Sequence, residues 1–353
     1  MFDIISQMQR WHGQQGKRPL YAATVIGIEG SAVRGPGATL GIAADCSLAG
    51  SVSGGCIEST VIQAVEGLRK RGAAELLTFC PSDDPFIGAP APCGGTVEVC
   101  IYPYSVEVAR AVEERMEAGL QGAWGVVIGG SSGQRGMSFA LDRDESLVLS
   151  RDVDTAFSLR LSEFLSMAPE DGGVIDEGKT RIFIQRIPVV PHALVIGGSH
   201  IGEVLVSILK RLLWKVTVID PRTAFAPAER FTAADEVLNV WPEEAGEILK
   251  LNTREDEKKP RPLAVAAVTH NEQIDDFGVA MGLNCGAFYV GVLGSTRTFG
   301  SRLERLKTKG FTAEDLNRVH GPIGIDIGAE SPEEIGLAIA AEMVQDYRNI
   351  AKR

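Results

Sequence analysis

The chain has 353 residues, 44% of them hydrophobic, so it is long enough for two domains that each bury a core. Its formal net charge of -11 would repel a phosphate backbone, which argues against a nucleic-acid partner. Neither an apolar run long enough to cross a bilayer nor a secretory signal is present, so we expect a cytoplasmic protein without membrane contact. Six scattered cysteines without a CxxC pair indicate free thiols rather than a zinc site or a disulfide framework.

The first part of the chain alternates strand-like runs with amphipathic helices, which predicts an α/β domain. Strands are predicted at residues 21–28, 38–44, 48–54, 96–103 and 123–130. A helix follows Gly55 and ends near Gly72, and a second one covers residues 105–119. The acidic stretch 142–176 is predicted to be irregular or weakly helical, and no internal repeat is apparent.

Two prolines, Pro188 and Pro191, interrupt strand pairing and suit a connection between domains. We therefore predict an N-terminal α/β domain over residues 1–188 and a second domain over residues 189–353. In the second domain short apolar strands alternate with helices, and the last helix starts at Pro332 behind a capping box of Ser331 and Glu334. This alternation predicts a Rossmann-like, doubly wound parallel sheet with right-handed crossovers.

A glycine-rich turn joins the first strand and helix of this second domain. It reads GGSHIG and comprises Gly197, Gly198, Ser199, His200, Ile201 and Gly202. The dinucleotide fingerprint G-x-G-x-x-G is matched at Gly197 and Gly202, whereas Ser199 replaces the middle glycine. Asp220 ends the next strand, where an acidic side chain accepts a hydrogen bond from a ribose hydroxyl. Two interpretations stay open: the turn binds NAD or another nucleotide, or only the fold is kept and Gly202 serves helix packing.

Two further motifs place a cysteine beside two glycines. SVSGGCIES contains Gly54, Gly55 and Cys56, and APCGGTVEV contains Cys93, Gly94 and Gly95. Glycines let the backbone approach a ligand closely, and Cys56 lies at a helix start, where the dipole favours a thiolate that binds molybdenum or sulfur species. The alternative is that each cysteine is a small buried side chain and its glycines form a turn.

Five segments in series carry a resemblance to a known family: GSVSGGCIES, PCGGTVEV, ALVIGGSHIGEVL with VTVIDPR, YVGVLGSTRT and GPIGIDIGAESPEEI. Together they resemble the XdhC/CoxI family of molybdenum hydroxylase accessory proteins, over nearly the whole chain. The resemblance implies a factor that binds molybdenum cofactor (molybdopterin), protects it, promotes its sulfuration with a cysteine desulfurase, and delivers it to an apo xanthine dehydrogenase or related hydroxylase.

Carried over by position, the resemblance implies that Cys56 and Cys93 contact the molybdenum or sulfur side of the cofactor, with Gly54, Gly55, Gly94 and Gly95 shaping the loops. Two departures from the family pattern are visible. The family usually reads GAGH where this chain has GGSH, although His200 is retained. A Thr-His-Asp-His type sequence is replaced by Thr269, His270, Asn271 and Glu272, which weakens a metal role there.

The ends of later strands in the second domain supply other candidates. His270 follows a predicted parallel strand, at the edge where doubly wound sheets bind ligands; its alternative is a solvated loop residue. Gly294, Ser295 and Arg297 form a turn into a helix that suits a pterin phosphate, unless Arg297 is simply solvated. Arg34 is a similar candidate, and its glycine and proline neighbours also suit a plain turn.

We expect an accessory factor rather than a catalyst. The alternative function is an NAD-dependent oxidoreductase, but no acid-base set is legible near the glycine turn apart from His270. A thiol redox or sulfur-relay role for Cys56 and Cys93 overlaps with the accessory role. Pairing of two chains would enclose a labile cofactor, so a homodimer is a further expectation.

Overall fold

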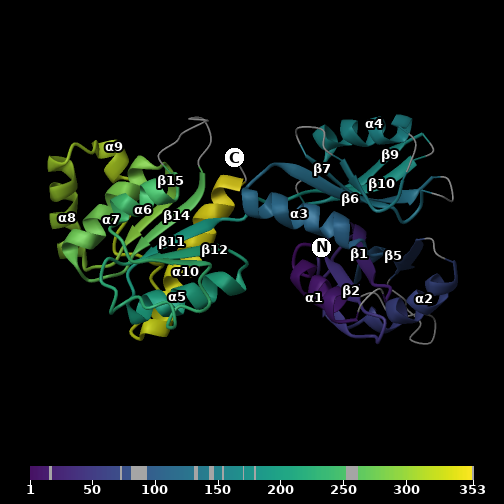
Figure 1. Cartoon of the computed structure of the whole chain (residues 1–353), viewed down its shortest axis with the longest axis horizontal. Coiled ribbons are helices and arrows are strands. Elements are labelled where there is room, and N and C mark those ends of the chain that lie inside the picture. Colours follow the sequence, from purple (N-terminus) through teal and green to yellow (C-terminus); the bar gives the residue numbers. More distant parts are fainter. Residues whose placement is uncertain are drawn as a thin grey trace. The chain divides into compact units, whose positions relative to one another are not determined.

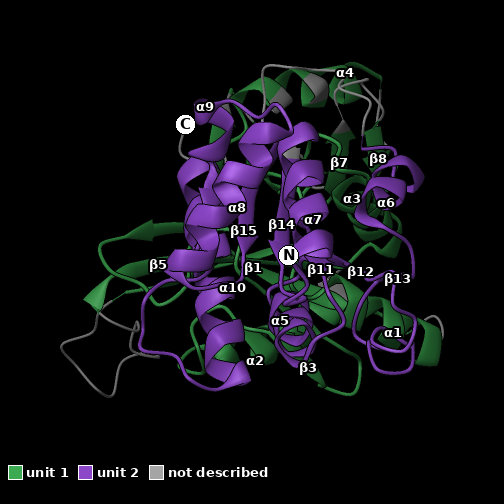
Figure 2. Ribbon diagram, turned by 90° about the vertical axis from the view of Figure 1, so that its left-hand side faces the viewer, with its two compact units in different colours: residues 1–189 green, residues 190–353 purple. Residues whose placement is uncertain are grey.

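The structure is a computed structural model that describes residues 1–15, 18–71, 74–80, 94–130, 134–142, 147–152, 155–169, 171–178, 180–251 and 261–351. The chain divides into two compact units, Met1–Val189 and Val190–Arg353, which Figure 2 shows in different colours. Among the described residues no helix has the length and apolar character needed to cross a membrane.

The N-terminal unit is built on two antiparallel sheets. Its helices and strands in chain order are α1 (Ile5–Gln15), β1 (Tyr21–Glu29), β2 (Thr39–Ile42), β3 (Leu48–Gly50), α2 (Glu58–Arg71), β4 (Glu75–Phe79), β5 (Thr96–Pro103), α3 (Val106–Ala118), β6 (Gly122–Gly129), β7 (Ser138–Asp142), β8 (Leu147–Leu149), α4 (Thr155–Glu163), the 3-10 helix η2 (Phe164–Met167), β9 (Gly173–Glu177) and β10 (Thr180–Arg186). The first sheet has the order β3-β2-β1-β5-β4 and the second β8-β7-β6-β10-β9. The acidic stretch 142–176 contains α4 and η2, as its helical alternative predicted, and also β8 and the start of β9, which were not predicted.

The two sheet orders are the same path repeated, because β6 to β10 pair as β1 to β5 do. A shared hydrogen-bond pattern supports this equivalence. Gly37 N donates to Val25 O (2.8 Å) in the first sheet, and Gly136 N donates to Val127 O (2.8 Å) in the second. Gly37 and Gly136 both have a positive φ, +84° and +80°. The expectation of no internal repeat was thus wrong for the topology: a first repeat (α1 to β5) is followed by a second repeat (α3 to β10).

The helices of this unit cover the sheets in layers (Figure 1). Alternate residues of β1 face α2, whose buried stripe is Ile57, Val61, Val65 and Leu68. In the second repeat, α4 and η2 cover the sheet with Phe157, Leu161 and Phe164. The other faces of both sheets pack with α1 and α3 in one central core. Each sheet is therefore buried on both faces, which holds its strand ends, and the loops they carry, in place.

The C-terminal unit contains β11 (His192–Ile196), α5 (His200–Arg211), β12 (Lys215–Ile219), β13 (Glu236–Leu238), α6 (Pro242–Ile248), β14 (Arg261–Ala267), α7 (Glu272–Asn284), β15 (Ala287–Val292), α8 (Thr296–Thr308), α9 (Ala313–Leu316), β16 (Val319–His320) and α10 (Pro332–Ala351). All neighbouring strands are parallel, in the order β13-β12-β11-β14-β15-β16. The predicted doubly wound parallel sheet is confirmed, and its order is that of a Rossmann fold.

Helices cover both faces of this parallel sheet (Figure 1). Ala193 and Val195 of β11 pack toward α5 and α10, whereas Leu194 and Ile196 pack toward α6, α7 and α8. The predicted capping box of α10 is present, since Ser331 N donates to Glu334 Oε2 (3.0 Å) and Glu334 N to Ser331 Oγ (3.2 Å). This layering leaves the carboxyl ends of the strands as the edge at which loops meet.

Candidate functional site

The first repeat gathers its longest loops at one end of its sheet. Register pairs place the end of β1, the start of β2, the end of β3, the end of β4 and the start of β5 at this end. The loops that follow β1, β3 and β4 therefore begin at the same edge, which we call the cysteine rim. Cys56 lies in the loop after β3. Cys93 lies in the sequence between β4 and β5 but outside the described residues, so its predicted position stays a prediction.

The loop that carries Cys56 is organised by one carboxylate, Glu58, the first residue of α2. The Glu58 side chain accepts six hydrogen bonds, all from the preceding seven residues. The donors are Ser51 Oγ (2.7 Å), Ser53 Oγ (2.6 Å), and the backbone N–H groups of Val52 (3.2 Å), Ser53 (3.0 Å), Gly55 (3.0 Å) and Ile57 (3.2 Å). Burial alone would raise the pKa of Glu58, but the hydrogen bonds from Ser53 and Ser51 outweigh it and lower the pKa to about 2.

Within this loop Gly54 and Gly55 have φ values of +83° and +120°, which only glycine adopts readily. The Cys56 side chain is exposed, and its backbone N–H donates to Ser53 Oγ (3.0 Å). The N–H groups at this helix start thus point at Ser53 and Glu58.

Gly95 lies against the end of β1. A Cβ on Gly95 would overlap with the carbonyl oxygen of Ser31 and lie 2.7 Å from that of Glu29, so the two backbones meet only because Gly95 has no side chain. Gly94 has open space around it and a φ of +78°. Arg34, in the loop after β1, makes an exposed ion pair with Asp3 (3.1 Å), which is a structural use of its charge.

The second candidate region is the carboxyl edge of the parallel sheet. The strand order reverses direction between β11 and β14, and ligands of doubly wound folds bind at such a point. Gly197 has a φ of +126°, and a Cβ there would lie 2.7 Å from Thr269 Cγ2. Gly202 allows α5 to pack on the turn, because a Cβ there would overlap with Gly197 O. Ser199 caps α5 by accepting from Gly202 N (3.1 Å), which explains a serine in place of the fingerprint glycine.

Asp220 is fully buried beneath this turn and is already engaged. Its carboxylate accepts from Gly198 N (2.9 Å) and, in a bidentate pair, from Arg222 Nε (2.9 Å) and Nη2 (2.8 Å). Burial would raise the pKa of Asp220, but the bonds from Arg222 and Gly198 lower it below its usual range. Gly198 O in turn accepts from Arg230 (2.8 Å). A ribose hydroxyl would have to displace Arg222, so the residues do not fit NAD in the described conformation.

His270 lies at the end of β14 with a φ of +61°, which is strained for a residue with a side chain. Its backbone is held through Thr269, whose Oγ1 donates to the buried Asp275 (2.6 Å). Burial raises the pKa of Asp275 despite the bonds from Thr269. The His270 side chain is exposed, and Asn271, a departure from the family pattern, is the N-cap of α7. His200 at the start of α5 is exposed as well, and its Nε2 lies 3.6 Å from Oε1 of Glu333 in α10.

Gly294, Ser295 and Arg297 follow β15 at the same edge. Ser295 is the N-cap of α8, and Arg297 is exposed. The turn is fixed from below by Arg302, which is 4% exposed and donates to Leu293 O (3.1 Å) and Asp276 (2.7 Å). The structure therefore brings the GGSH turn, His270 and the Gly294–Arg297 turn to one edge, as predicted from their strand ends.

Two protein-family models match the chain. The model of the XdhC Rossmann domain matches residues 193–343, and that of the XdhC and CoxI family matches residues 14–79, which include Cys56. The chain belongs to the XdhC and CoxI family. The resemblance inferred from the sequence motifs is confirmed.

Two known proteins similar to this XdhC-family chain match most of its length, and a third matches about half of it. A Bacillus subtilis protein, named as a probable subunit of xanthine dehydrogenase, is 27% identical over 338 residues, covering 93% of each chain. An uncharacterized Escherichia coli protein, YqeB, is 26% identical over 184 residues, which cover 49% of this chain and 30% of YqeB. A crystal structure of a xanthine dehydrogenase from Bacillus halodurans superposes with a TM-score of 0.75 at 22% identity, covering 98% of this chain and 96% of the other. This likeness supports the fold.

Sequence reasoning missed two parts of the candidate sites in this family member. One is Glu58, although it stands inside the SVSGGCIES motif. The other is the loop after β16, which carries the exposed Ile325 and Ile327 at the carboxyl edge of the sheet. Gly321, in this loop, packs directly on Phe299 of α8. The signal for the second part was the GPIGIDIG motif, from which no site residue was chosen.

Proposed function

We propose that this chain is an accessory protein of a xanthine dehydrogenase or related molybdenum hydroxylase. It holds molybdenum cofactor, supports its sulfuration by a cysteine desulfurase, and delivers it to the apo-enzyme. Family membership and the name of the Bacillus subtilis relative support a xanthine dehydrogenase as the partner. The observation that carries the cofactor part is the exposed Cys56 thiol in a loop that Glu58 holds in advance.

The cysteine rim suits the metal side of such a cargo. Thiolate sulfur is a soft ligand that binds molybdenum and sulfur species well. Among the described residues no three histidine, cysteine or carboxylate side chains gather as a metal cluster, so the rim would add a ligand to a metal that the pterin already holds. Gly54 and Gly55 keep side chains away from the thiol, which leaves room for a bulky cofactor.

The carboxyl edge of the C-terminal unit offers a second, separately testable contribution. Helices α5 and α8 begin there, and exposed His200, His270 and Arg297 add cationic or hydrogen-bonding groups. Helix starts and arginine side chains bind phosphate monoesters well, and the pterin carries one. The same groups do not require a nucleotide, and the Asp220–Arg222 pair makes NAD the less favoured ligand.

The test is an anaerobic titration of the purified protein with molybdenum cofactor, with bound pterin measured after gel filtration. We expect retention near one pterin per chain, a fall of about ten-fold in Cys56→Ala and Cys93→Ala, and loss in the double variant. Cys46→Ala is the matched control, because Cys46 is also exposed but lies between β2 and β3, at the opposite end of the same sheet. Unchanged retention in Cys56→Ala, in Cys93→Ala and in the double variant would contradict the thiol contact.

NAD is titrated in parallel. Absence of pterin retention together with tight NAD binding would overturn the accessory role and favour an NAD-dependent oxidoreductase. Homodimer formation is measured in the same gel-filtration runs, as the elution volume before and after the cofactor is added.

A further inference from the structure

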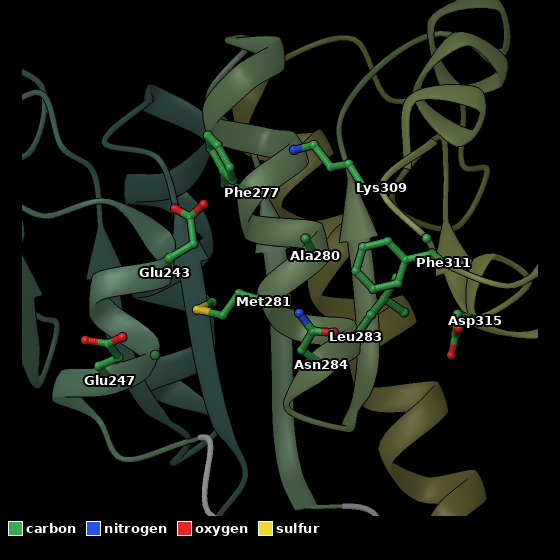
Figure 3. A pocket seen from close by; sticks show the side chains of 12 residues that line it. Glu243, Glu247, Phe277, Ala280, Met281, Leu283, Asn284, Lys309, Phe311 and Asp315 are labelled. Atoms are coloured by element: carbon green, nitrogen blue, oxygen red, sulfur yellow. The ribbon is translucent and has the colours of Figure 1, made fainter. Parts of the chain in front are cut away.

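A groove of about 830 Å³ lies on the C-terminal unit, and none of the residues that line it belongs to the turns at the carboxyl edge of the sheet. Figure 3 shows α7 along its floor, α6 as one wall, and the segment from Lys309 to Asp315 as the other. The apolar side chains that line the floor and the second wall are the partly exposed Phe277, Ala280 and Phe311 and, beneath them, the buried Met281 and Leu283. The groove is open along its length, so it suits an elongated partner rather than an enclosed small molecule.

Helix α7 is apolar on two sides. Its inner side buries Ile274 and Val279 against the sheet. Its outer side carries Phe277, Ala280 and Met281, of which Met281 is buried, and it ends at the exposed polar Asn284; the four residues form one stripe about 10 Å long. A surface helix normally presents polar residues outward. Phe277 and Ala280 nevertheless stay partly exposed.

The rim of the groove is acidic. Glu243 and Glu247 stand one turn apart on α6, and Asp315 lies on the opposite wall. Lys309, which also lines the groove, places its ammonium 4.2 Å from the centre of the Phe277 ring. Trp241, 37% exposed, meets the same ring edge-on at 5.7 Å. Aromatic side chains with this exposure are frequent anchors of protein interfaces, and the Phe277 face accepts cations.

We propose that this groove docks a helical segment of a partner protein, with apolar side chains spaced by three and four residues and basic residues on its flanks. The stripe on α7 matches the helix-in-groove mode of recognition, in which side chains at such spacings insert between two walls. The acidic rim selects basic flanks and disfavours a second copy of this chain, whose net charge is -11. This inference does not depend on the proposed cofactor role.

The probe is a designed, fluorescently labelled peptide of about 18 residues with a leucine stripe and lysine flanks, compared with the same stripe flanked by glutamate. Fluorescence anisotropy with the full chain should show binding of the lysine peptide at least about ten-fold tighter than of the glutamate peptide, with the difference shrinking at high salt. Equal affinity of the two peptides, or no binding of either, would overturn the proposal.

Two substitutions locate the binding. Ala280→Arg places a long cation on the groove floor and should weaken the lysine peptide at least about ten-fold. Leu337→Arg is the matched control, because Leu337 is exposed on α10, which covers the other face of the sheet, and it should leave the affinity unchanged. The reverse pattern would refute the groove as the docking site.

Two further measurements cover the case in which Ala280→Arg does not fold and the case in which the groove binds a second copy of the chain. If Ala280→Arg does not fold, amide chemical shifts of the wild-type chain are followed instead, and changes confined to α6, α7 and residues 309–315 support the proposal. Shifts elsewhere alone overturn it. Analytical ultracentrifugation of the wild type and Ala280→Arg then tests the other occupant: a dimer that the substitution abolishes would overturn the proposal, because the groove would then take a second copy.

Discussion

The two repeats of the N-terminal unit have the same strand order and differ in the length of the connections at one end of their sheets. Residues 80–95 join β4 to β5 in the first repeat, whereas only residues 178–179 join β9 to β10 in the second. Residues 51–57 lead into α2, but residues 150–154 lead into α4. The shared part is the order of the strands and the Gly37 or Gly136 turn. Cys56 and Cys93 lie in these longer connections, so the candidate site is on segments that the second repeat has only in shorter form.

The largest expected loss of stability is at Gly95, which packs on the end of β1 in the first repeat without room for a side chain. In Gly95→Ala the new Cβ would overlap with backbone atoms of Ser31 and Glu29, and we expect a loss of about 4 kcal/mol in the stability of the unit. Urea unfolding, followed by hydrogen exchange of β5 amides, measures it. Gly94→Ala is the neighbouring control: only its positive φ of +78° opposes a side chain, which costs about 1 kcal/mol. Equal costs at both positions would refute the close-packing account.

An intermediate effect is expected for Glu58→Gln. The glutamine amide keeps one oxygen acceptor, but its NH2 group replaces the second oxygen and faces the loop groups that donate to that oxygen in the wild type. We therefore expect a loss of about 2 kcal/mol in the stability of the first repeat. Because the folded pKa of about 2 lies below the ordinary value of 4.5, the contribution of Glu58 is fully present above pH 4.5. It is lost as the pH falls through the folded value.

The measurement is hydrogen exchange of α2 amides in the wild type and in Glu58→Gln, between pH 5 and the lowest pH at which the chain stays soluble. Wild-type protection should fall toward that of the variant as Glu58 takes up its proton. A constant gap between the two proteins across this range would contradict the hydrogen-bond account.

The smallest effect tests the equivalence of the repeats. Gly37→Ala and Gly136→Ala each place a side chain at a positive φ, so we expect each to cost about 1 to 2 kcal/mol. Gly37 is crowded by the Gln185 side chain and Gly136 by the backbone of Ala74, so the second should cost slightly more. Thermal unfolding of both variants measures the difference. One neutral and one severely destabilised variant would show that the two turns are not equivalent.

The parallel sheet could be predicted from sequence because buried parallel strands read as short apolar runs between amphipathic helices. The repeat of the N-terminal unit could not be predicted from sequence. Strands such as β8, Leu147–Leu149, are short and only partly buried, so they lack the alternation that identifies a strand. The repeated turn shares little sequence beyond its glycine, since its hydrogen bonds are made by backbone groups, which every residue supplies.

The candidate sites divide in the same way. Positions at strand ends, such as His270 and Ser295, follow from topology and could be predicted. Side-chain pairings could not be predicted. Arg222 lies two residues after Asp220, and only the side-chain geometry shows that it donates two hydrogen bonds to the Asp220 carboxylate. Glu58 was missed because an acidic residue in the first turn of a helix is ordinary on dipole grounds, whereas its partners here are the loop before it.

The loop from Ser51 to Glu58 satisfies its own polar groups, since all six hydrogen bonds to Glu58 come from residues 51–57. Its polar groups are therefore satisfied within eight consecutive residues, and Val52 and Ile57 anchor it in the core of the first repeat. The second repeat has a strand and a helix at the equivalent place, β8 and α4. A graft of the loop between β8 and α4 would therefore need apolar space in the second repeat for the equivalents of Val52 and Ile57 in order to display a second such thiol.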